Sequence, residues 1–85
     1  MAFSFPAHAM PTCIERTVVL KFLQERHNEV PVSQGVANNG ALVEVLASED
    51  GGWSLLITMP GGGSCLVASG EDWRNLPRYI PGSDS

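Results

Sequence analysis

Cys13 and Cys65 carry the most reactive side chains of this sequence, and the chain has no third cysteine. Two such residues form a disulfide in an oxidising compartment and stay reduced in the cytosol. A bond between them would close a loop of about fifty residues and add about 4 kcal/mol of stability in the chain-entropy model. We favour this disulfide. Free structural thiols are the alternative, and a redox or nucleophilic Cys13 at a helix start is a third interpretation that lacks a CxxC motif.

The other residues with catalytic or ligating side chains are scattered. His8 lies near the N-terminus, and His27 lies near the end of a predicted helix, where a surface or capping role is the usual one. Glu49 and Asp50 fall in a predicted turn, which is typical of solvated carboxylates. No set of histidines, cysteines and carboxylates has zinc or calcium spacing. The sequence therefore predicts no metal and no cofactor.

Three consecutive glycines, Gly61 to Gly63, precede Ser64 and invite comparison with a phosphate-binding loop. A phosphate loop also needs a following lysine and a helix whose N-terminus faces the anion, and both are missing here. A nucleophilic serine would require a Gly-x-Ser-x-Gly elbow, which is also missing. We therefore expect no catalytic residue and no enzymatic activity.

The size and net charge of the chain restrict the classes of partner that we expect. A chain of 85 residues is one small domain, which buries only about 60% of the surface that its unfolded form exposes. The net charge is −4 and the five basic residues are dispersed, so a nucleic acid is not an expected partner. No apolar run reaches the roughly 18 to 20 residues that cross a bilayer, so we expect no membrane insertion.

The first eleven residues contain Ala7-His8-Ala9, a small-x-small pattern like a signal-peptidase site. We interpret residues 1–11 as a leader or signal-peptide remnant and expect a periplasmic or secreted protein. A disordered N-terminus of a cytosolic protein is the alternative. Residues 12–74 then form a single α+β domain, and residues 75–85 form a mobile tail.

A helix is expected from Cys13 to about His27, because Thr12 and Glu15 have the spacing of a capping box. Its apolar residues recur with a period of 3.6, which indicates an amphipathic helix that packs one side on a sheet. They are Ile14, Val18, Val19, Phe22 and Leu23.

Four antiparallel strands in a meander are predicted at about 32–37, 41–47, 53–59 and 65–68, with a helical turn at 71–73. Asn39-Gly40 is typical of a type I′ turn, and Glu44 is expected to point to solvent. The fold class is therefore α+β, with the N-terminal amphipathic helix packed on a four-stranded sheet and an extended C-terminal tail.

The register of the last hairpin stays open, because Pro60 and the three glycines allow several loop lengths. A four-residue loop would put Cys65 on the face of Leu56, whereas a loop one residue longer or shorter, or a bulge, would align Cys65 with Leu55 and Ile57. Apolar and aromatic side chains on the sheet face away from the helix would form an interaction surface. Its candidate residues are Trp53, Leu55, Ile57, Leu66, Trp73 and Tyr79, with Leu56 and Val67 replacing the aliphatic members in the other register.

The combination of Cys13 before a helix, Gly52-Trp53, Pro60-x-Gly62 and Cys65 through Gly70 resembles a group of small exported proteobacterial proteins of unknown function. The resemblance covers about residues 12 to 74. It implies that the protein is exported and that its cysteines are paired. It implies no activity, ligand or catalytic residue. We expect a non-enzymatic protein that acts by binding an unknown protein partner or a second copy. The alternative is an accessory structural subunit of a larger assembly, such as a phage-related one, that docks through the edge strand at 32–37.

Overall fold

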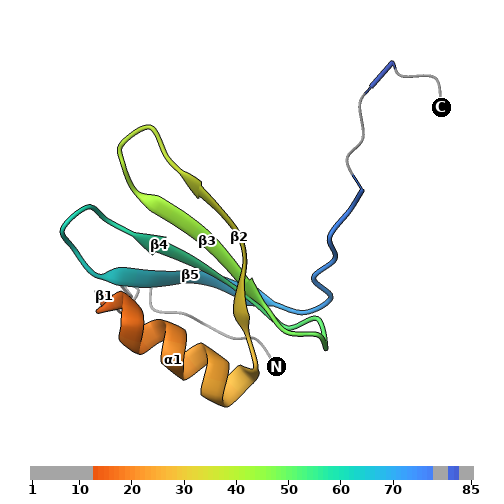
Figure 1. Cartoon of the computed structure of the whole chain (residues 1–85), viewed down its shortest axis with the longest axis horizontal. Helices are drawn as coiled ribbons and strands as arrows, with labels where there is room; N and C mark the ends of the chain where they lie inside the picture. The colour runs from red at the N-terminus through yellow and green to blue at the C-terminus, as the bar shows by residue number, and fades with distance from the viewer. Residues whose placement is uncertain (1–12, 78–80, 83–85) are drawn as a thin grey trace, which may run out of the picture.

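A computed structural model describes residues 13–77 and 81–82 of the chain. One helix lies across one face of a five-stranded antiparallel sheet whose strand order is β1-β5-β4-β3-β2 (Figure 1). The α+β class and the meander are confirmed, but the sheet has a fifth strand that the sequence did not predict. The elements are β1 (Cys13–Ile14), α1 (Arg16–His27), β2 (Val30–Val36), β3 (Leu42–Ala47), β4 (Trp53–Thr58) and β5 (Ser64–Gly70).

Helix α1 begins at Arg16 and not at Cys13, because Cys13 and Ile14 pair with β5 as the short strand β1. Glu15 separates the two elements with extended dihedral angles, φ −55° and ψ 134°, and no side chain caps the helix start. The predicted end is confirmed. Asn28 takes the left-handed conformation there, and its N–H donates to the Gln24 carbonyl, which is a common helix ending.

The core lies between α1 and the sheet. Val19 and Leu23 from the helix pack with Leu46 and Leu56, and the exposed fractions of these four side chains are 8% or less. The buried stripe is narrower than the sequence predicts. Val18 and Phe22 belong to the predicted apolar side but are about half exposed, so α1 contributes little more than one row of side chains to the core.

The β2–β3 hairpin turns at residues 37–40, as predicted, but not as a type I′ turn. A type I′ turn requires positive φ at both central residues, whereas Gly40, with φ 88°, is the residue with positive φ in this turn. The Gly40 N–H donates to the Ala37 carbonyl across 2.8 Å. The geometry is that of a type I turn followed by a left-handed glycine, the arrangement that suits longer hairpin loops.

The β4–β5 register is the one produced by the longer loop. Ile57 lies opposite Cys65 and Thr58 opposite Ser64, so residues 59–63 form the loop. Gly61 has φ 68° directly after Pro60, which fits the second central position of a type II turn. The register shifts between Leu55 and Leu56, so this hairpin also contains a β-bulge.

The predicted helical turn at 71–73 is wrong. The chain bends after β5, where Asp72 has a φ of 61°, and the Trp73 N–H then donates to the Gly51 carbonyl across 2.8 Å. Beyond Trp73 the chain leaves the sheet in extended form, as expected, and the Leu76 side chain is 81% exposed (Figure 1).

Candidate protein-binding surface

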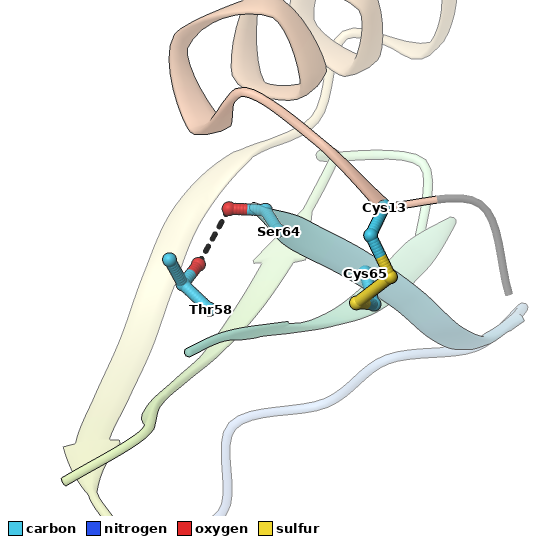
Figure 2. The surroundings of a disulfide bond; sticks show 4 residues. All are labelled: Cys13, Thr58, Ser64 and Cys65. Carbon is cyan, nitrogen blue, oxygen red and sulfur yellow. Dashed lines mark hydrogen bonds between the residues drawn. A yellow bond between two sulfur atoms is a disulfide. The ribbon is translucent and has the colours of Figure 1, made fainter. Parts of the chain in front are cut away.

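The disulfide between Cys13 and Cys65 is confirmed, but it joins two strands and not a helix to a strand (Figure 2). The two cysteines lie directly opposite each other in the β1–β5 pair, with their Cα atoms 4.1 Å apart, although they are separated by 52 positions in the sequence. Successive side chains of a strand point to opposite faces. Ser64, the neighbour of Cys65, accordingly faces the helix side, where its hydroxyl shares a hydrogen bond with Thr58 (Figure 2).

The sheet face that α1 does not cover is apolar. We call it the open face and define it by Val43, Val45, Leu55 and Ile57. Val43 pairs with Ile57 and Val45 with Leu55, so the four side chains form one contiguous block on β3 and β4. All four are half-buried by their strand neighbours, and no other element of the described residues packs over them (Figure 1). A sheet face of this composition usually contacts a partner.

A pair of tryptophans closes one end of the open face. Trp53, on β4, lies on the same side as Leu55, and its ring centroid is 5.8 Å from that of Trp73. Its indole Nε1–H donates to the Glu71 carbonyl across 3.1 Å. Gly70 lies beneath the indole, since a Cβ at that position would come within 2.9 Å of three ring atoms.

The structure separates one of the predicted surface residues from the others. Trp53, Leu55, Ile57 and Trp73 come together at the open face, but Leu66 lies opposite Leu56 on the helix side of the sheet. Its placement follows from the register, because Cys65 faces Ile57 and its neighbour must face the other way. Tyr79, the remaining predicted member, and His8 lie outside the described residues, as does the predicted leader at 1–11.

Sequence reasoning also missed two members of the open face. Val43 and Val45 alternate with Leu42, Glu44 and Leu46 along β3, and this alternation was visible in the sequence. What the sequence did not decide was which of the two sets meets the helix. Leu46 does, and the valines therefore point away from it.

Glu44 does not point to solvent, as the sequence analysis expected, but is completely buried on the helix side. The Arg16 guanidinium donates to both of its carboxylate oxygens, from Nε across 2.8 Å and from Nη2 across 2.7 Å, and the Gln34 amide adds a longer contact. The hydrogen bonds from Arg16 lower the pKa of Glu44 below its ordinary value and outweigh the opposing effect of burial. The same contact raises the pKa of Arg16. We assign this pair a structural role, because the charged groups of Arg16 and Glu44 bind each other.

Strand β2 forms the edge of the sheet beside the open face. Its seven residues are all exposed, and residues 30–37 include no charged side chain. A hollow of about 290 Å³ adjoins the strand, with Gly35, Val36, Val43 and Val45 among the residues that line it. Edge strands are usually protected by charges, prolines or bulges. Here the protection is limited to Pro31 and the adjacent bulge.

Comparisons with protein-family models, curated proteins and solved structures gave no match. None of the helical structure in the described part of the chain has the length and apolar character that spanning a membrane requires.

Proposed function

We propose that the chain is a small exported protein that acts by binding another protein through the open face and catalyses no reaction. The observation that carries this proposal is the contiguous block of Val43, Val45, Leu55 and Ile57 on an uncovered sheet face. Burying such a block against a partner contributes about 25 cal/mol for each Å² of apolar surface removed from water.

The disulfide supports an exported location. Disulfides form and persist in secreted and periplasmic proteins and are rare in the cytosol. The Cys13–Cys65 bond is therefore compatible with a periplasmic or extracellular protein. It also stabilises a sheet whose second face is free to bind a partner, since the core on the helix side is small.

The experiment replaces valines by isosteric threonines on the open face. Val43→Thr with Val45→Thr keeps the β-branched shape and removes apolar surface, whereas Val18→Thr makes the same change on the exposed side of α1. Proteins captured from the native envelope by the three chains are compared by quantitative mass spectrometry. We expect the wild type and Val18→Thr to recover a common partner that the double variant loses. Equal recovery by all three folded chains would contradict the proposal.

A second candidate function is an accessory structural subunit of a larger, phage-related assembly that docks through β2. The fully exposed, uncharged edge strand favours it, because such an edge can pair with a strand of another chain. Val36 is 74% exposed on β2 and pairs with Leu42, so Val36→Lys places a charge at the edge and leaves the four residues of the open face unchanged. Loss of assembly in size-exclusion chromatography by this variant alone would favour the subunit, and its indifference would argue against it.

A further inference from the structure

The structure contains two buried carboxylates that face the helix side of the sheet, and only one of them has a cationic partner. Glu44 is paired with Arg16, as described above. Glu29 follows the C-terminal end of α1 and is 6% exposed. Its Oε1 accepts a hydrogen bond from the Ser54 hydroxyl across 2.6 Å. Among residues 13–77 and 81–82, no lysine, arginine or histidine forms an ion pair with it.

Burial removes part of the hydration of this carboxylate, and the Ser54 hydroxyl replaces only part of that loss at Oε1. The other oxygen, Oε2, keeps contact with solvent, because no buried side-chain oxygen of the described residues lacks a partner. A carboxylate has about four acceptor positions, and Ser54 occupies one of them. The described residues donate no further hydrogen bond to Glu29. The Glu29 carboxylate can therefore accept further hydrogen bonds from a positively charged donor.

Glu29 lines a pocket of about 220 Å³ between the end of α1 and the adjoining ends of β4 and β5. Phe22, Leu23 and Leu66 provide apolar walls, and the exposed residue Glu71 also lines the pocket. Neither lysine nor arginine is among the lining residues. His27 also lines the pocket, so the pocket is negative in charge when that imidazole is neutral, and its surface is partly apolar.

We propose that this pocket binds an organic cation with an aliphatic stem, a primary ammonium or a guanidinium, as on a lysine or arginine side chain. The cation would donate hydrogen bonds to Glu29, and its methylene stem would pack on the apolar walls. A compact, fully hydrated ion would gain nothing from those walls, whereas basic side chains bury their stems in this way. None of the four residues that define the open face lines this pocket, although Trp53 borders both, so this inference does not depend on the proposed function.

The test is a titration of the isotope-labelled protein, followed by two-dimensional NMR, with butylammonium and with the uncharged 1-butanol as a matched control. We expect butylammonium to shift the resonances of Leu23, Ser54 and Leu66 in a saturable way in the millimolar range, which is ordinary for so small a ligand, and 1-butanol to shift them much less. Absence of a saturable shift would overturn the proposal, as would equal responses to both compounds. Stronger binding of calcium chloride at the same residues would overturn the assignment to an organic cation.

Two variants separate the site from the rest of the surface. Glu29→Gln keeps an acceptor for the Ser54 hydroxyl and removes the charge, so we expect at least a tenfold weaker response to butylammonium and a melting temperature equal to or above that of the wild type. Glu25→Gln makes the same change at an exposed position of α1 and should leave binding unchanged. Undiminished binding of butylammonium by Glu29→Gln would overturn the proposal. The open-face variant, Val43→Thr with Val45→Thr, should bind butylammonium as the wild type does, whether or not the open face has a partner.

A last pair of ligands identifies the source of the cation. N-acetyl-lysine N-methylamide presents the cation on a polypeptide backbone, and its norleucine analogue lacks the charge. Tighter binding of the lysine compound than of butylammonium would support a side chain of a partner polypeptide. Tighter binding of butylammonium would support a free amine as the ligand. In either case the norleucine compound should bind more weakly than the lysine compound, because it lacks the charge.

Discussion

Arg16, the first residue of α1, holds Glu44 at the middle of β3 through two hydrogen bonds of 2.8 and 2.7 Å. The two residues are 28 positions apart, so the pair fixes the start of the helix over one point of the sheet. The guanidinium side chain is 37% exposed and the carboxylate is not exposed at all. An arginine that donates to both oxygens of a carboxylate fixes the position of one element over the other. This matters here because α1 contributes little more than one row of side chains to the core.

Removal of Arg16 should strongly destabilise the fold. Arg16→Ala leaves the Glu44 carboxylate buried without its cation, which costs about 3 kcal/mol, the lower end of the range for a broken buried pair. The partial exposure of Arg16 is the reason to choose the lower end. Urea denaturation followed by circular dichroism measures the loss. Arg16→Met with Glu44→Leu is the matched control and should recover most of the stability, and a double variant as unstable as Arg16→Ala would contradict this account.

The pair should also make stability depend on acid pH. Because the folded-state pKa of Glu44 is lowered, its contribution is fully present above the unfolded-state pKa of about 4.3 and is lost as the pH falls through the lowered folded value. Glu44→Gln has no charge to titrate there. The stability difference between wild type and this variant should therefore shrink below about pH 4.3, whereas the exposed control Glu25→Gln should show a much smaller change. A constant difference down to pH 2 would contradict the assignment.

Reduction of the disulfide should lower the free energy of unfolding by about 4 kcal/mol, the value for a closed loop of this length. Urea melts of the oxidised and reduced protein measure the change. Cys13→Ser with Cys65→Ser should match the reduced protein. A reduced protein as stable as the oxidised one would show that the helix–sheet core is sufficient by itself.

Gly70 should tolerate no side chain, whereas Gly35 should. A Cβ at Gly70 would lie 2.9 Å from the Trp53 indole, so Gly70→Ala should cost about 1 to 3 kcal/mol through overpacking and should change the tryptophan fluorescence. At Gly35 no atom lies within 4 Å of the corresponding position, and Gly35→Ala should be neutral or slightly stabilising. Equal effects at the two positions, measured by thermal melts, would argue against the observed placement of the indole.

Local signals predicted much of this fold. The alternation of apolar residues placed the long strands, and the turn-forming glycines located the hairpins, because both depend on neighbours in the sequence. The end of α1 was predicted for the same reason. The pairing of the two cysteines followed from there being no other cysteine.

The parts that were missed depend on residues distant in the chain. Strand β1 is only two residues long and exists because Cys13 is held beside Cys65. The burial of Glu44 depends on Arg16, whose side chain reaches it from another element. The residues next to Glu44 in the sequence do not indicate this partner. Leu66 was placed on the wrong face because the glycine-rich loop permits several registers, of which tertiary packing selects one.

The bond between Cys13 and Cys65 supports both the proposed location and the stability of the sheet, and its state in the cell is the most direct test of the account. Native cells are harvested with an alkylating reagent that blocks any free thiol, and the purified chain is weighed by intact-mass spectrometry with and without prior reduction. We expect an unmodified chain that gains the mass of two hydrogens on reduction, because the structure pairs both cysteines. A chain that carries an alkyl group on each cysteine would contradict the exported, disulfide-bonded protein proposed here.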